Sequence, residues 1–229
     1  YTNELLRQHQ LDLPTAHLLS EGDTLPACNF PLVLKPLRGR GSQGVQLIED
    51  TIQLEAAIEK FFSSRSYGHK VVLETYLSGK EITTTVMPPG TYRINDKKVV
   101  HEKHWCLHPV ERINHVNGIT PYSGQVPVSA NSHLMPMEVL KLPAMQRIIQ
   151  QCAYAAERID ARAPIRIDSR ADTAGTYRLF DVNLKPNMTG ASRPHRAGQN
   201  SLSAIAAAAL NWNYTDFIWN ILQQRWLMK

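Results

Sequence analysis

Four polar residues at the ends of two short β-rich runs could do chemistry together. Asp168 lies two positions after Arg166, and Asp181 lies two positions before Asn183. Because side chains at positions i and i+2 of a strand emerge on the same face, Asp181 and Asn183 should point the same way. Carboxylate and amide oxygens suit Mg²⁺ held against substrate phosphates, whereas zinc would prefer Cys or His. These residues alone fit a metal site and a pair of amphipathic strands with solvated carboxylates equally well.

A glycine-rich turn earlier in the chain could cover phosphate groups. The run 30–36 reads as a short buried strand with Lys35 near its end, and the turn 37–44 that follows holds three glycines. Glycines allow backbone N–H groups to approach oxygens closely, and Lys35 adds a positive charge. The turn is not a P-loop, because no Gly-Lys-Ser/Thr sequence precedes a helix. The alternative is an ordinary hairpin.

The segment 73–81 joins the end of one expected strand to the start of the next. Its extended backbone could hydrogen-bond the edge of a purine, and Glu81 could accept hydrogen bonds from ribose hydroxyl groups. An edge connector with surface carboxylates is the interpretation that we would favour if the segment stood alone.

Taken in chain order, these features match a known pattern. The strand with Lys-Pro and the glycine loop is followed by Glu-x-x-Leu-x-Gly-x-Glu, then Lys103, Arg-x-Asp and Asp-x-Asn-x-x-Pro-x-Met-Thr. This order covers almost the whole chain. It resembles the ATP-grasp superfamily and, within it, the D-alanine–D-alanine ligases and related carboxylate–amine ligases.

The resemblance implies a fold, a reaction and cofactors. The fold would be the α+β ATP-grasp fold, in which two α+β subdomains clamp a nucleotide. The activity would be that of an ADP-forming ligase, which joins two small amino-acid-like substrates through an acylphosphate and forms an amide bond. ATP and Mg²⁺ would be the cofactors.

The resemblance also implies roles for residues on the nucleotide side. Lys35 would contact the α- and β-phosphates, and Ser42 with neighbouring backbone amides would cover them. Glu74 and the backbone of Tyr76 and Leu77 would hold adenine.

The remaining implied roles concern the ribose and the reacting groups. Glu81 would hold the ribose, Lys103 falls where these ligases place a lysine near the γ-phosphate, and Arg166 would stabilise the charge of the tetrahedral intermediate. The metal ligands, for two Mg²⁺ ions, would be Asp168, Asp181 and Asn183.

Three positions depart from the family pattern. The family usually has glutamate where this chain has Asp181, and the shorter side chain leaves the number of metal ions open. Asn187 replaces a glycine of a Pro-Gly-Met turn, and we expect asparagine to tolerate the left-handed conformation there. Gly41 falls where D-alanine ligases have a serine that organises the substrate site, so the substrates stay open.

An inserted loop, 190–199, separates the metal motif from the Ser-Leu at the next helix start. We expect Arg193 in this loop, Ser201 and Asn187 to contact substrate, with Arg193 and Ser201 binding the carboxylate of the acceptor. A basic solvent loop is the alternative.

Two other functions remain open from the sequence. One is an ATP-grasp enzyme of a natural-product pathway that activates a non-amino-acid carboxylate, which the departure at Gly41 and the inserted loop keep in view. The other is a nucleotide-binding module without turnover, which the change to Asp181 favours.

The pattern of elements predicts an α+β arrangement with mostly antiparallel strand neighbours. We expect a lead-in helix and linker over 1–25, a small ATP-grasp subdomain over 26–87, and a large subdomain over 88–229. The expected helices are 3–10, 51–62, 143–158, 202–210 and 214–226, and the later strands are 71–74, 81–87, 164–168 and 176–182. The range 88–136 is expected to be irregular loop with short strands. The family's amino-terminal domain would be missing from this chain and would be needed to complete the substrate site.

Composition limits the class of protein. The chain has 229 residues, a net charge of +5 and 43% hydrophobic residues, enough for a substantial core. Lys and Arg are scattered, so we expect no nucleic-acid partner, and no apolar run approaches a membrane span. Three widely spaced cysteines fit no disulfide framework and favour a cytoplasmic protein. The family resemblance implies small-molecule substrates as partners. A homodimer stays open.

Overall fold

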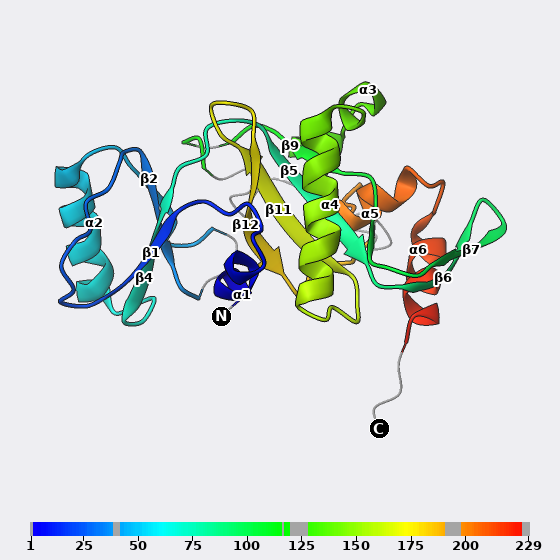
Figure 1. The fold of residues 1–229 in the computed structure, drawn as a ribbon, viewed down its shortest axis with the longest axis horizontal. Coiled ribbons are helices and arrows are strands. Elements are labelled where there is room, and N and C mark those ends of the chain that lie inside the picture. Colours follow the sequence, from blue (N-terminus) through cyan, green and yellow to red (C-terminus); the bar gives the residue numbers. More distant parts are fainter. Residues whose placement is uncertain (1, 39–41, 116, 120–127, 191–197, 226–229) are drawn as a thin grey trace. The chain divides into compact units, whose positions relative to one another are not determined.

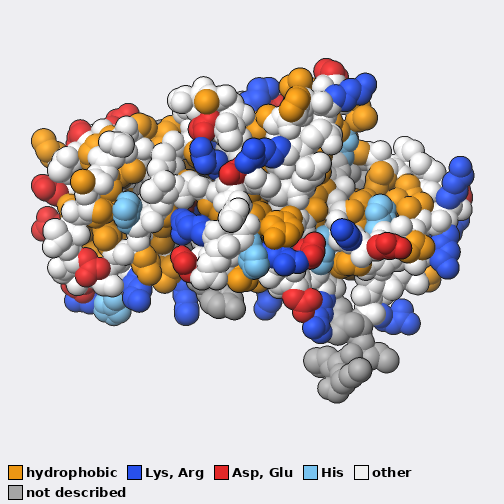
Figure 2. Space-filling view, in the orientation of Figure 1, with side chains coloured by type: hydrophobic (Ala, Val, Ile, Leu, Met, Phe, Trp, Pro, Cys, Tyr) orange, Lys and Arg blue, Asp and Glu red, His pale blue; other side chains and the backbone are white. Residues whose placement is uncertain are grey.

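The computed structural model describes residues 2–38, 42–115, 117–119, 128–190 and 198–225. The chain forms two compact units. The small unit comprises Pro14–Ser78 and Asn114–Val126, and the large unit comprises Tyr1–Leu13, Gly79–Ile113 and Pro127–Lys229. Within the described ranges, no helix is both long enough and apolar enough to cross a membrane. On the face shown in Figure 2, basic and acidic side chains are interspersed rather than gathered in one field.

A four-stranded antiparallel sheet forms the small unit (Figure 1). Its spatial order is β1-β4-β2-β3. The strands are β1 Ala16–Ser20, β2 Leu32–Pro36, β3 Gln46–Ile48 and β4 Lys70–Thr75. Because β2 is paired on both sides, the segment that carries Lys35 is fixed within the sheet.

Helix α2, Thr51–Ser64, supplies the other half of the small unit's core. Asp50 caps its first turn by accepting a hydrogen bond from the Gln53 N–H, and Arg65 ends it in the left-handed conformation at φ 53°. Its apolar stripe is buried against the strands in one cluster that includes Leu54, Ala57, Phe61, Phe62, Leu32, Leu34, Val71 and Leu73.

The large unit is built on a second antiparallel sheet, of order β10-β9-β5-β11-β12, with β8 also paired to β5. The strands are β5 Glu81–Met87, β8 Trp105–Cys106, β9 Val110–Arg112, β10 Ser132–Leu134, β11 Ile165–Ala171 and β12 Tyr177–Asn183. Strand β5 is entirely buried, as expected for the centre of a covered sheet.

Helix α4, Pro143–Arg158, covers one face of this sheet (Figure 1). Pro143 starts the helix, where its missing N–H needs no partner. The helix packs on apolar side chains of the strands, in a core that includes Met145, Ile148, Cys152, Ala155, Ile82, Ile165, Ile167 and Leu179. The short helices α1, Thr2–Gln8, and α3, Met137–Leu140, contact α4.

A separate apolar cluster includes residues of helices α5, Leu202–Ala208, and α6, Tyr214–Gln223, and of strand β6, Gly90–Ile94. Strand β6 forms a hairpin with β7, Lys97–His101. Asn213 and Asp216 form a capping box at the start of α6. Four aromatic rings meet in this region: those of Tyr92, His101, Trp105 and Trp212.

The predicted α+β class is confirmed, and every strand pairing in the described part of the chain is antiparallel. The expected helix 143–158 and strand 81–87 occur at those residues. Strand β1 was not predicted, because its pattern is too short to stand out and its pairing with β4 is long-range. The expectation of irregular loop with short strands over 88–136 agrees with the β6–β7 hairpin and the three further short strands in the described part of this range.

Candidate active site

Two cross-strand pairs bring together the four polar residues of β11 and β12. Asp168 lies opposite Asp181, and Arg166 lies opposite Asn183. Such partners project from the same face of an antiparallel sheet, with Cβ atoms about 4.5–5.5 Å apart. Ile167, between the two polar residues of β11, packs in the core with α4. The polar residues therefore project from the opposite face, which we call the polar face.

A β-bulge in β12 produces this arrangement. On an unbroken strand, Leu179 and Asp181 would share a face because they are two positions apart. The pairing skips Phe180, however, so that Asp181 lies opposite Asp168 whereas Leu179 lies opposite Ser169. The extra residue reverses the alternation of side chains. Leu179 is therefore fully buried in the core with α4, while the polar residues after the bulge reach the polar face.

Two neighbours hold the carboxylate of Asp168. Arg166 donates from Nε to Oδ1 and from Nη2 to Oδ2, both at 3.2 Å, which makes a bidentate pair. The Thr83 hydroxyl on β5 donates to Oδ1 at 2.7 Å. Asp168 raises the pKa of Arg166 against the opposing effect of burial, and Asp181 acts in the same direction. The carboxylate and guanidinium are thus fixed as a charged pair.

Arg112 is a buried cation on the polar face that the sequence analysis missed. It ends β9, lies opposite Glu81, and is 6% exposed. Burial lowers the pKa of Arg112, while Asp168 and Glu81 favour its charged form. The signal in the sequence was a charge at the end of a three-residue strand, inside a segment that we expected to be mostly irregular. Glu81, expected at the ribose, is buried beside it.

The donor chemistry of the polar face fits a hard divalent cation. Asp168 and Asp181 offer carboxylate oxygens, and the Asn183 Oδ1 already accepts a hydrogen bond from the Lys185 N–H at 3.0 Å. No group of three or more His, Cys, Asp or Glu side chains that could hold a metal occurs in the described ranges. Two carboxylates and one amide suit Mg²⁺, which keeps several ligands from water or phosphate, better than a metal that needs a full protein cage.

The small unit brings together two of the residues expected at the nucleotide. Lys35 Nζ lies 2.5 Å from Glu74 Oε2, and Glu74 is 4% exposed. The Tyr76 N–H donates to the Pro31 carbonyl at 3.2 Å, and Leu77 is buried. Ser42 is exposed with φ 59°, and its carbonyl accepts a hydrogen bond from the Val45 N–H, which closes the turn.

Lys103 lies away from the polar residues of β11 and β12. It is exposed in the turn between β7 and β8, and β8 pairs with the Val86–Met87 end of β5 rather than with Thr83. The turn is held at its base by stacking of His101 on Trp105, with ring centroids 4.2 Å apart. The role implied for Lys103 stays a prediction.

The residues expected at the acceptor substrate have structural roles of their own. The Ser201 hydroxyl accepts a hydrogen bond from the Ala204 N–H at 3.2 Å and caps α5. Asn187 does not adopt the expected left-handed conformation; its Oδ1 instead accepts from the Thr189 N–H at 2.9 Å, so the side chain itself builds the turn. Arg193 and Gly41 lie outside the described residues.

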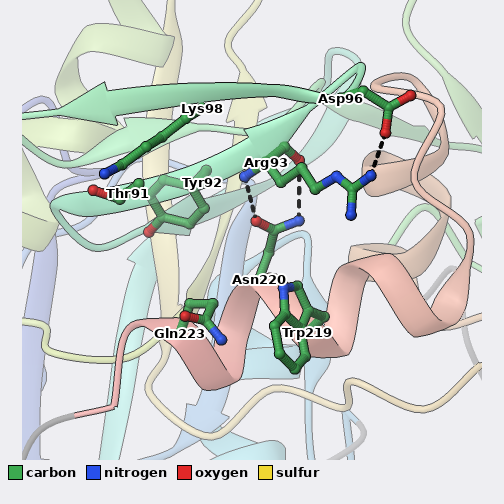
Figure 3. Close-up of a pocket in the computed structure, with 8 residues that line it drawn as sticks. All are labelled: Thr91, Tyr92, Arg93, Asp96, Lys98, Trp219, Asn220 and Gln223. Carbon is green, nitrogen blue, oxygen red and sulfur yellow. Dashed lines mark hydrogen bonds and ion pairs between the residues drawn. The ribbon is translucent and has the colours of Figure 1, made fainter.

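A pocket elsewhere in the large unit contains none of the expected site residues. It lies between the β6–β7 hairpin and α6, and has a volume of about 410 Å³ (Figure 3). Asn220 ties its two sides together through hydrogen bonds with the backbone N–H and carbonyl of Arg93. Arg93 in turn forms an ion pair with Asp96 at 2.5 Å. The pocket is therefore a feature of the packing of α6 on the hairpin.

Solved structures share the fold of this chain. The D-alanine–D-alanine ligase of Bacillus anthracis, solved in complex with ATP, has a TM-score of 0.67 at 20% identity, over 97% of this chain and 62% of that one. The ligase of Coxiella burnetii has a TM-score of 0.68 at 13% identity, over 97% and 55%. The VanG D-Ala:D-Ser ligase of Enterococcus faecalis gives 0.65 at 16% identity, over 98% and 60%. The fold is the ATP-grasp fold, as the resemblance implied.

The family follows from the sequence. The model of the D-ala D-ala ligase C-terminus matches residues 20–222, and the chain belongs to this family. The D-alanine–D-alanine ligase of Francisella philomiragia is 26% identical over 228 residues, which cover 97% of this chain and 65% of that protein. The ligase of a Synechococcus strain is 24% identical over 205 residues, covering 90% and 54%. The chain thus spans less than two thirds of the length of these relatives.

Proposed function

We propose that this chain is the ATP-binding part of an ADP-forming carboxylate–amine ligase that joins two small amino-acid-like substrates. The observation that carries the proposal is the polar face, where Asp168 lies opposite Asp181 and Arg166 lies opposite Asn183. In a member of this family, such a set of oxygen donors beside a fixed guanidinium supports phosphoryl transfer from ATP.

The reaction proceeds in two steps. A carboxylate oxygen of the first substrate attacks the γ-phosphorus of ATP, so that an acylphosphate forms and ADP leaves. The amine of the second substrate then attacks the acyl carbon, and the tetrahedral oxyanion collapses to the amide as phosphate and a proton leave. Both steps spread negative charge, which a preorganised guanidinium such as Arg166 stabilises without reacting itself.

Asp168, Asp181 and Asn183 would hold Mg²⁺. Bound Mg²⁺ neutralises phosphate charge and polarises phosphoryl oxygens. Thr83 and Arg166 fix the orientation of the Asp168 carboxylate, so that it does not have to be ordered when ligand binds. Two Mg²⁺ ions would require a carboxylate that bridges them, and the short side chain of Asp181 is less suited to this than the family's glutamate.

The small unit would hold the adenine and the α- and β-phosphates. Lys35 supplies a cation and Ser42 a hydroxyl at the glycine-rich turn. Glu74 is buried, and Tyr76 and Leu77 offer an ordered backbone for the purine edge. Since Lys35 is already paired with Glu74, its charge is held in place before the phosphates arrive.

An amino-terminal domain would complete the substrate site. The proposal accords with the relatives, of which this chain spans 65% or less in the cases given. On this chain, Asn187, Arg193 and Ser201 are the residues that we propose on the acceptor side. The cytoplasm is the compartment that we propose, with ATP and amino acids as the small-molecule partners.

A nucleotide-binding module without turnover is the second candidate. It is favoured by the observation that the Asp168 carboxylate already accepts from Arg166 and Thr83. The side chain of Asp181 is also one methylene shorter than the family's glutamate.

Phosphate release tests these alternatives. The full-length protein that carries this chain is incubated with Mg²⁺-ATP and pools of D- and L-amino acids. Release that depends on an amino acid supports the ligase. Binding of ATP with no release under any pool supports the module, and release with a non-amino-acid carboxylate alone points to the natural-product alternative.

A further inference from the structure

The guanidinium of Arg112 combines burial, charge and vacant hydrogen-bond donors. The residue is 6% exposed at the end of β9. Within the part of the chain that the structure describes, neither its Nε nor its Nη2 has a hydrogen-bond partner. Buried N–H groups without partners destabilise a protein, so such a pair suggests a site where a ligand supplies the acceptors.

The two vacant donors define the shape of that ligand. Nε–H and one Nη–H of a guanidinium lie side by side and parallel, a fork that matches two oxygens of one oxyanion. A single oxygen can accept from both donors, as Asp12 Oδ2 does from Nε and Nη2 of Arg147. An oxyanion supplies one oxygen to each donor and also offsets the buried positive charge, so the ligand that matches best is a carboxylate or a phosphoryl group.

The neighbouring charges favour an additional anion. Asp168 and Glu81 stabilise the charge of Arg112, whereas Arg166 opposes it. Arg166 is already engaged with Asp168 by two hydrogen bonds, so its fork is occupied. An oxyanion on Arg112 would offset the repulsion between the two guanidinium groups.

We propose that Arg112 is a catalytic residue that binds the terminal phosphoryl group of ATP through Nε and Nη2. The inference rests on the proposed ligase function and deepens it. A phosphoryl group is favoured over a substrate carboxylate because Arg112 shares the face with Asp168, the proposed ligand of the Mg²⁺ that accompanies the phosphates. On this assignment the charge near the γ-phosphate comes from β9 rather than from the turn that carries Lys103.

The test compares nucleotides that differ in their phosphates. Dissociation constants of Mg²⁺-ATP and of AMP are measured by calorimetry for wild type, Arg112→Gln and Arg112→Lys. The matched control is Arg178→Gln, which removes an arginine of the same sheet that pairs with Asp172. Melting temperatures without nucleotide report on folding.

Loss of a bidentate charged contact should weaken Mg²⁺-ATP binding by about 10-fold or more in Arg112→Gln. We expect a smaller loss in Arg112→Lys, which keeps the charge but not the fork. AMP affinity and the nucleotide-free melting temperature should stay near wild type in both, and Arg178→Gln should bind ATP normally.

Three results would overturn the assignment. Wild-type ATP affinity in Arg112→Gln would exclude the contact. Equal losses for ATP and AMP, together with a lower nucleotide-free melting temperature in both variants, would show a structural role. Intact ATP affinity with a weakened affinity for an amino acid would assign Arg112 to a carboxylate. A wild-type protein that fails to bind Mg²⁺-ATP contradicts the proposed function as well, which separates that failure from one confined to Arg112.

Discussion

Asp181 lies directly opposite Asp168 because β12 skips Phe180 in its pairing with β11. The bulge lets one strand bury Leu179 beneath α4 and still present a carboxylate on the other face two positions later. The candidate metal site is therefore set by backbone pairing, and substitutions of its side chains should change ligand binding more than folding.

Asp181→Asn should weaken Mg²⁺-dependent ATP binding by about 10-fold, because the amide keeps the shape of the side chain but loses the charge that a hard cation prefers. The measurement is ATP affinity as a function of Mg²⁺ concentration. Asp160→Asn is the control, since Asp160 is exposed and forms an ion pair with nearby Arg162. Unchanged ATP affinity at limiting Mg²⁺ would remove Asp181 from the set of ligands.

Arg166→Ala should lower kcat by about 10²-fold, the usual effect of removing one electrostatic stabiliser of a transition state. Steady-state phosphate release measures it, and Arg162→Ala, at an exposed position, is the control. A rate within about threefold of wild type would contradict the assignment.

Lys103→Ala, assayed in the same way, tests the role that the family resemblance implies for Lys103. A γ-phosphate contact predicts a loss of kcat of similar size. Because the structure places Lys103 in an exposed turn at another part of the sheet, a rate near wild type would leave Arg112 and Arg166 as the cations of the site.

Ser201→Ala should lower the free energy of unfolding by about 1 kcal/mol, because it removes the N-cap of α5. If Ser201 also binds the acceptor, KM for the amine substrate rises as well. Asn213→Ala is the matched control: it removes the cap of α6 at a similar cost but should leave KM unchanged. Equal KM values in the two variants would restrict Ser201 to its structural role.

The folded protein should lose stability as pH falls below about 6.5, in part through His101. Burial lowers the pKa of His101 from its ordinary value of 6.5. At a pH between the two pKa values, His101 is therefore protonated in more of the unfolded chains than of the folded ones. The stability that neutral His101 contributes is fully present above pH 6.5 and is lost as pH falls through the lower pKa of the folded state. Phe at this position keeps the stack on Trp105 without titrating.

Urea unfolding between about pH 8 and pH 5 measures this dependence. His101→Phe should show a shallower fall of the free energy of unfolding than wild type. His17→Phe, at an exposed position of β1, is the control and should keep the wild-type slope. Parallel slopes in all three proteins would contradict the account of His101.

Local pattern was enough to predict the elements that carry most of the candidate residues. The 3.6-residue spacing predicted α4, because a long amphipathic helix has a strong periodic signal. The threonine-rich run predicted β5, because β-branched residues favour strands. The order of motifs led to the family. These are properties that neighbouring residues in the chain determine.

Long-range pairing accounts for what the sequence did not reveal. Strict alternation places Leu179, Asp181 and Asn183 on one face, and only the register with β11 shows that a bulge separates the first from the others. Arg112 ends a strand of three residues whose place beside Glu81 depends on β5. Asn187 builds its turn with its side chain, which the substitution for glycine alone did not indicate.

Transfer of oxygen from the carboxylate substrate to phosphate tests the central claim most directly. The full-length protein is given Mg²⁺-ATP and the amino acids that support phosphate release, with ¹⁸O in both carboxylate oxygens. Formation of an acylphosphate predicts that each phosphate released carries one ¹⁸O atom, because the bond that breaks in the second step joins the acyl carbon to an oxygen of the original carboxylate. Phosphate without ¹⁸O, released at the same rate, would show that water rather than a carboxylate accepts the phosphoryl group and would contradict the ligase.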